Sequence, residues 1–113
     1  EADRRVMTVS SSSATTLIDL DTSNGKGQFV RANIRYIRIT NMDDSNWIRV
    51  RFMKAGAETA DVKVLANSTF MLSDGSMDVD ASAGSFSAFV DIDEIKAQAN
   101  GSDCDIEYVV FAV

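Results

Sequence analysis

The stretch NIRYIRITNMDDSNWIRVRFM, residues 33–53, alternates apolar and polar side chains on both sides of a short polar connection. The apolar members of the alternation are Ile37, Ile39, Ile48, Val50 and Phe52. A period of two residues is the pattern of a β-strand that buries one face. The stretch therefore predicts two antiparallel strands joined by a turn centred on residues 43–44.

The register of this hairpin follows from keeping its apolar side chains on one face. The expected core-facing pairs are Ile39 with Ile48 and Ile37 with Val50, and the expected outer pairs are Arg38 with Arg49 and Tyr36 with Arg51. The alternation changes phase between Ile34 and Ile37. An extra residue in one strand has this effect, so we expect a β-bulge near Tyr36.

Short alternating segments recur along the rest of the chain, separated by Gly, Asn, Asp and Ser, and proline is absent. Further strands are expected at 4–9, 15–20, on both sides of a tight turn at 66–68, at 77–80 and 86–90, and in a final hairpin that turns through 100–103. The expected pairs of that hairpin are Ala99 with Cys104, Ala97 with Ile106, Ile95 with Tyr108 and Lys96 with Glu107. The pattern predicts one all-β antiparallel domain of about eight strands over residues 1–113, with residues 1–14 as an N-terminal arm or an edge strand.

Composition restricts the classes of function. The chain has 113 residues, a net charge of −6 and no histidine, so nucleic acid and anionic membranes are not expected as partners. The single cysteine, Cys104, reads as a buried thiol on a strand. Segments 19–25 and 78–84 match calcium loops poorly, because the glycine is one place late and no glutamate follows at the twelfth position. We expect no enzyme activity, no metal and no cofactor.

The arginine residues of the first hairpin are the remaining candidate site. Like charges directly opposite each other on a sheet are destabilising, and arginine beside exposed aromatic residues is typical of protein–protein contacts. One interpretation is an ordinary solvated face; the other is a surface that a second copy or another acidic protein covers. The candidate partner-binding residues are Arg35, Tyr36, Arg38, Trp47, Arg49 and Arg51, followed by Arg4 and Arg5. A carbohydrate site in which Trp47 and Tyr36 stack on sugar rings is the alternative.

Three segments together resemble a known family: YIRITNMDDSNWIRVRF, VKVLANSTFML and FSAFVDIDEIKAQANGSDCDIEYVVF. They are similar to small virion structural proteins of tailed bacteriophages over roughly residues 29–113, although Asn67 stands where the middle turn usually has glycine. The resemblance implies a jelly-roll-like β-sandwich that decorates the outer capsid surface as a cement protein. It also implies the major capsid protein as partner, commonly with the decoration protein as a homotrimer. A tail-fibre carbohydrate-binding domain and a tail or head–tail connector component are the alternatives.

Overall fold

The computed structural model of the chain describes residues 2–21, 28–30, 33–54, 57–73, 78–79 and 90–113. The strands are β1 (Ala2–Val9), β2 (Thr15–Asp21), β3 (Gln28–Val30), β4 (Ile34–Asn41), β5 (Ile48–Lys54), β6 (Ala57–Val64), β7 (Thr69–Leu72), β8 (Asp78–Val79), β9 (Val90–Asp91), β10 (Glu94–Ala99) and β11 (Cys104–Ala112). The all-β class expected from the alternation is confirmed. No helix among the described residues has the length and apolar character needed to cross a membrane.

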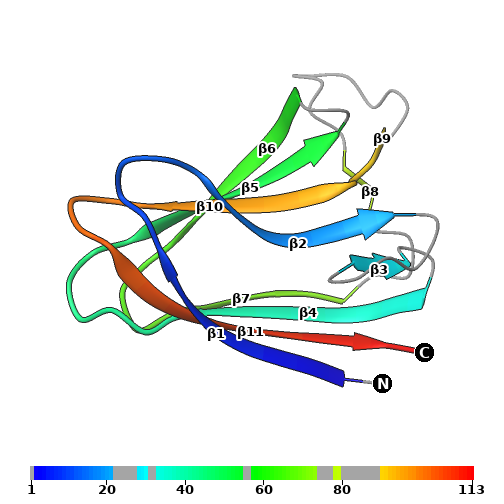
Figure 1. The fold of residues 1–113 in the computed structure, drawn as a ribbon, viewed down its shortest axis with the longest axis horizontal. Helices are drawn as coiled ribbons and strands as arrows, with labels where there is room; N and C mark the ends of the chain where they lie inside the picture. The colour runs from blue at the N-terminus through cyan, green and yellow to red at the C-terminus, as the bar shows by residue number, and fades with distance from the viewer. Residues whose placement is uncertain (1, 22–27, 31–32, 55–56, 74–77, 80–89) are drawn as a thin grey trace.

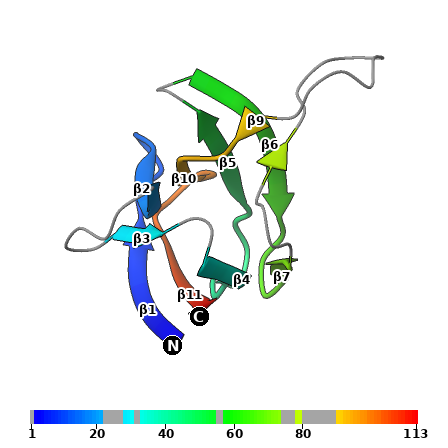
Figure 2. The same ribbon diagram turned by 90° about the vertical axis from the view of Figure 1, so that its right-hand side faces the viewer.

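The strands form two packed sheets and one short pair. One sheet has four strands in the order β1-β11-β4-β7, and the other has five in the order β3-β2-β10-β5-β6. Figures 1 and 2 show the two sheets as layers, with β8 and β9 pairing separately beside them. All pairings are antiparallel except that of β2 with β3.

The strand order is that of a jelly roll. Chain neighbours β1 and β2, β4 and β5, β6 and β7, and β10 and β11 lie in opposite sheets. Each such pair is joined by a connection that crosses from one layer to the other. The jelly-roll-like sandwich that the family resemblance implies is confirmed, and residues 2–9 form an edge strand of the four-stranded sheet.

The first expected hairpin does not form. β4 pairs with β11 and β7, whereas β5 pairs with β10 and β6, so the two halves of the stretch 33–53 lie in different sheets. The residues opposite Arg38 are Val109 and Met71, and those opposite Arg49 are Gln98 and Lys63. The predicted arginine pairs are therefore wrong. Six residues separate β4 from β5, enough chain to cross the ~10 Å between packed sheets.

The final hairpin is wrong for the same reason, because β10 lies in the five-stranded sheet and β11 in the four-stranded one. Lys96 is opposite Arg51 and Thr16, and Glu107 is opposite Val6 and Thr40. The alternation itself was predicted correctly. Its apolar residues meet across the sandwich instead of side by side within one sheet.

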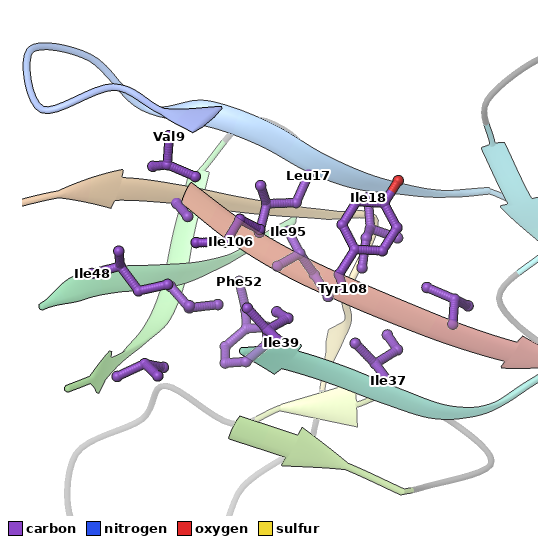
Figure 3. Packing of buried hydrophobic residues seen from close by; sticks show 14 of the residues in the cluster. Val9, Leu17, Ile18, Ile37, Ile39, Ile48, Phe52, Ile95, Ile106 and Tyr108 are labelled. Atoms are coloured by element: carbon purple, nitrogen blue, oxygen red, sulfur yellow. The ribbon is translucent and has the colours of Figure 1, made fainter. Parts of the chain in front are cut away.

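The core is the space between the two sheets, and aliphatic side chains from both fill it (Figure 3). Ile37 and Ile39 enter from β4, and Ile48 and Val50 enter from β5, all fully buried. The rings of Phe52 and Phe70 bridge the layers with their centroids 5.8 Å apart. Burying one such side chain contributes about 1.5–3 kcal/mol relative to leaving it in water, so this shared core holds the two sheets together.

Several local expectations can be compared with the structure. The bulge near Tyr36 is confirmed, because Phe111 is opposite Tyr36 whereas Ala112 is opposite Ile34. Asn67 adopts a positive φ of 58° in the turn at 66–68, a conformation that asparagine tolerates better than most residues. Of the strands expected at 77–80 and 86–90, residues 78–79 and 90 are extended; the remainder lies outside the described residues.

Candidate interaction surfaces

Four connections between the sheets meet at one end of the sandwich, on the left in Figure 1. They are residues 10–14, 42–47, 65–68 and 100–103, and together, without Trp47, they are called the loop end. Hydrogen bonds tie them to one another. Ser11 N donates to Asp103 Oδ1 at 2.9 Å, and Asn46 Nδ2 donates to Ser102 Oγ at 2.8 Å. The loop end is consequently one cross-linked surface.

Asn41, the last residue of β4, anchors this surface from inside and is fully buried. Its Nδ2 donates to the carbonyl oxygens of Asn46 at 2.9 Å and Val64 at 3.3 Å. Its Oδ1 accepts the backbone N–H of Asp43 at 3.0 Å. A buried polar side chain is tolerated only when its hydrogen-bonding groups have partners, and here those partners fix the course of two connections.

The loop end is acidic. Residues 10–14, 42–47, 65–68 and 100–103 contain Asp43, Asp44 and Asp103 but no lysine or arginine. Asp43 accepts the backbone N–H groups of Asn46 at 2.7 Å and Ser45 at 3.0 Å, and these bonds hold the pKa of its carboxyl below the ordinary value of 3.8. Asp43 is therefore ionised at neutral pH. Met42 and Leu65 are exposed on the same end, so negative charge and apolar area occur together.

Trp47, the residue before β5, begins a second surface on the outside of the five-stranded sheet. Two rows of outward side chains cross the strands beside it: Gln98, Arg49 and Lys63 in one row, and Lys96, Arg51 and Asp61 in the next. Trp47 and these six residues are called the Trp47 face. The Lys63 Nζ lies 4.9 Å from the centroid of a Trp47 ring, a cation–π contact. Four cations and one carboxylate make this face basic in an acidic chain.

Asp61 holds two of these cations. Arg51 binds it through Nε at 3.0 Å and Nη2 at 3.2 Å, and Arg49 Nη1 donates to it at 2.8 Å. In the following row Glu94 lies 3.9 Å from Lys96 Nζ and accepts the hydroxyl of Thr16. Repulsion between Arg49 and Arg51 is thus offset inside the chain, which corrects the expectation that only a second molecule relieves it.

The Trp47 face is hollowed on both sides of Trp47 and Arg49. One hollow, of about 370 Å³, is lined by Trp47, Arg49, Asp61, Val62 and Lys63. The second, of about 330 Å³, is lined by Ser11, Trp47, Arg49, Arg51, Gln98, Ala99, Asn100 and Gly101. Asn100 N donates to Trp47 O at 3.0 Å. The Trp47 face therefore borders the loop end of the same chain.

The outside of the four-stranded sheet forms a third surface, called the four-stranded face. Its outward residues follow from the strand register and include Arg4, Val6, Tyr36, Arg38, Met71, Glu107, Val109 and Phe111. Val6, Met71 and Phe111 are exposed by 50 %, 58 % and 45 %. Three of the six large apolar side chains exposed among the described residues thus lie on this one face.

Two arginine residues alternate with apolar residues in one row across the four-stranded face, which reads Arg4, Val109, Arg38 and Met71. Glu107 forms ion pairs with Arg4 and with Arg38, the latter at 3.3 Å. The Nε of Arg38 is buried and has no hydrogen-bond partner within the described part of the chain. Among the described residues, the guanidinium of Arg38 is therefore held by one ion pair, through Nη2 and not through the buried Nε.

The eight candidate residues from the sequence do not form one site. Arg4, Tyr36 and Arg38 lie on the four-stranded face, whereas Trp47, Arg49 and Arg51 lie on the Trp47 face. Arg5 follows the core-facing phase of Met7 and Val9 on β1, and its charge acts on the hydroxyl of Tyr108. Arg35 is the bulge residue, and its Nη1 donates to the carbonyl of Ile34 at 3.0 Å.

This division separates Trp47 from Tyr36, so these two aromatic residues cannot stack together on one sugar. Sequence reasoning also missed Asp61, Lys63 and Lys96 on the Trp47 face. The alternation of DVKV at 61–64 puts its two charged residues on one side of a strand, so this signal was present. The sequence reasoning did not pair β6 with β5, and that pairing is what places Asp61 and Lys63 beside Arg51 and Arg49.

Groups that carry chemistry are sparse in the described residues. Cys104 is fully buried, and burial, with the charges of Asp43, Asp103 and Asp105, raises the pKa of its thiol above 9.0. The buried thiol predicted from the sequence is confirmed. No group of three His, Cys, Asp or Glu side chains suited to a metal ion occurs in the part of the chain that the structure covers. Most of segments 19–25 and 78–84 lies outside it.

Comparison with known proteins bears on the fold. No protein-family model and no curated protein matches the chain. A solved structure from Bacillus endospore appendages, described as a novel family of disulfide-linked pili, has a TM-score of 0.56. It is 9 % identical in sequence, and the match covers 100 % of this chain and 86 % of that one. The likeness shows a shared fold.

Proposed function

We propose that the chain is a non-enzymatic structural protein that decorates the outer surface of a viral capsid and bridges its major capsid protein subunits. The observation that carries the proposal is the four-stranded face, where Val6, Met71 and Phe111 are exposed among arginine and aromatic side chains. Large apolar side chains exposed on one face of a sheet mark protein contacts. The family resemblance supplies the identity of the partner, and the jelly-roll fold shared with a pilus protein agrees with a structural role.

The four-stranded face has the composition of a contact surface. Aromatic, methionine and arginine side chains are enriched in protein interfaces, and Tyr36, Phe111, Met71 and the two arginine residues Arg4 and Arg38 supply all of these types. The apolar residues lose water when the shell covers them. The arginine residues of this face then meet carboxylates or carbonyl groups of the partner, which fixes the orientation of docking.

Binding of this kind stabilises the assembled shell by mass action. A protein that binds only the assembled state lowers its free energy by RT ln(1 + [L]/Kd) per site, about 2.7 kcal/mol when its free concentration is one hundred times Kd. Many copies on one particle multiply this term. An acidic exterior keeps such an abundant protein soluble before it binds.

Co-sedimentation with purified shells of the particle that carries the chain tests the proposal. The variant Met71→Ser with Phe111→Ser removes two exposed side chains, a change that surface positions tolerate within about 0.5 kcal/mol each. We expect the bound fraction to fall at least tenfold. Lys54→Ser, on the other sheet, should bind as the wild type does.

Two results would count against the proposal. Undiminished binding of the double variant would exclude the four-stranded face as the contact. Immunogold labelling that finds the chain away from the shell surface of purified particles would exclude decoration altogether.

A further inference from the structure

We propose that the loop end of one copy docks on the Trp47 face of a second copy, forming a contact between neighbouring decoration proteins. This contact is separate from the four-stranded face, and it does not depend on the shell. Opposite charge on the two surfaces identifies a second copy of the chain as the molecule that binds the Trp47 face. The loop end holds three carboxylates and no cation, and the two rows beside Trp47 hold four cations and one carboxylate.

The loop end and the Trp47 face also carry apolar groups that can pack against each other. Met42 and Leu65 are exposed on the loop end by 46 % and 56 %. The Trp47 face offers the hollow of about 370 Å³ beside the indole ring. An aliphatic side chain that enters this hollow removes apolar area from water on both copies, and the surrounding Lys63 and Arg49 then lie close to the incoming carboxylates.

Both surfaces are held by hydrogen bonds inside the chain before they meet. The loop end is cross-linked through Asn41, Asn46 and Ser11, as described above. On the Trp47 face, Asp61 orients Arg49 and Arg51. Contacts between preorganised surfaces lose less side-chain entropy on binding than contacts between mobile ones.

The contact is heterologous, because two different surfaces of the chain meet. Heterologous contacts build rings or filaments when they repeat in one direction. Since the Trp47 face borders the loop end of its own chain through Asn100 and Trp47, two copies can also exchange both contacts in a closed dimer. The size of the oligomer, including the trimer that the family resemblance implies, is therefore measured in the same experiment.

A pair of charge-reversal variants tests the contact. The face variant is Lys63→Glu with Lys96→Glu, which leaves the ion pairs of Asp61 with Arg49 and Arg51 in place. The loop variant is Asp44→Lys with Ser45→Lys, two exposed positions outside the bonds that join one connection to another; the Ser45 side chain bonds Asp43 within its own connection. Circular dichroism confirms that each variant is folded.

Sedimentation velocity of the isolated protein at low salt measures association. Wild type is expected to self-associate, and each variant alone to do so at least tenfold more weakly, since like charges then face each other. An equimolar mixture of the two variants should recover association, because the reversed face meets the reversed loop end and the two unaltered surfaces meet each other. Lys54→Glu and Asp3→Lys control for the change in net charge.

The outcome separates this inference from the proposed function. A monomeric wild type, unchanged association of either variant, or a mixture that fails to recover association would each overturn the contact. None of these results bears on shell binding through Met71 and Phe111, which is measured by co-sedimentation of the other variants.

Discussion

Replacement of the buried Asn41 by alanine tests whether one side chain organises the loop end. The substitution removes three hydrogen bonds, to Asn46 O at 2.9 Å, Val64 O at 3.3 Å and Asp43 N at 3.0 Å. Each such bond contributes about 1 kcal/mol net. The bond to Val64 is fully buried and long, and the other two are partly accessible to water. We therefore expect a loss of about 2–3 kcal/mol in the free energy of unfolding.

That loss is large on the scale of ~5–15 kcal/mol typical of whole domains. It corresponds to a fall in Tm of roughly 10 °C for a domain of this size. Urea unfolding followed by the fluorescence of the single tryptophan, Trp47, and by far-ultraviolet circular dichroism measures it. Asn100→Ala, an exposed asparagine of the same end, is the control and should stay within about 0.5 kcal/mol of wild type.

A midpoint for Asn41→Ala equal to that of Asn100→Ala would refute the reasoning, because the three bonds would then contribute nothing to stability. A second signature follows from the position of the bonds. The variant should lose hydrogen-exchange protection first at residues 42–47 and 65–68, which Asn41 connects. Uniform loss across both sheets would show that Asn41 acts only through global stability.

Two further predictions concern Gly101 and Tyr108. Gly101 has a φ of +85°, and a Cβ there would lie 2.9 Å from Asn46 Oδ1, so Gly101→Ala should cost about 1–2 kcal/mol in chemical unfolding; an unchanged midpoint would contradict this. Burial raises the pKa of the Tyr108 hydroxyl above 10.0, so as pH rises this hydroxyl ionises in the unfolded chain before it does so in the folded chain. The stability that the neutral hydroxyl contributes is therefore lost as pH rises through the pKa of the folded state. Tyr108→Phe should therefore show a shallower decline of stability above about pH 10, and equal slopes would count against the burial argument.

The extent to which the sequence predicts this fold depends on what alternation encodes. A period of two specifies which side chains of a strand face the core, and the burial of Ile37, Ile39, Ile48 and Val50 agrees with it. It does not specify which strand lies alongside. In a hairpin and in a jelly-roll crossing the same residues point inward, so the local pattern is identical while the hydrogen-bonded partners differ.

Two features of the sequence nevertheless argued against the first hairpin. The first connection has six residues and lacks the Asn-Gly or Asp-Gly pair of tight two-residue turns. The second feature is the unfavourable pairing of Arg38 with Arg49 that a hairpin requires. That repulsion was interpreted as a sign of a partner. In the structure it marks a wrong register, because Arg38 is paired with Glu107 and Arg49 with Asp61.

The candidate surfaces were predictable only in part. Trp47, Arg49 and Arg51 share one face as expected, because alternation along a single strand places them there. Lys63 and Lys96 join them from β6 and β10, which are neighbours of β5 only in the folded sheet. The four-stranded face was not anticipated as a surface with exposed apolar residues, because Val6, Met71 and Phe111 come from three separate strands and share one face only through the register of β1, β11, β4 and β7.

The fold is shared with a subunit of disulfide-linked pili, and the cysteine content of the present chain limits how far that likeness extends. A continuous disulfide-linked polymer needs at least two cysteines in each subunit, one for each neighbour. These 113 residues contain only Cys104, and its thiol is fully buried at the start of β11 with its Sγ 3.6 Å from the carbonyl oxygen of Ser102. These residues therefore lack the cysteines for a continuous disulfide-linked polymer, and the contacts proposed for the four-stranded face, the Trp47 face and the loop end are non-covalent. Because two of those three surfaces carry opposite charge, raising the salt concentration should weaken contacts between copies more than apolar contacts with a shell.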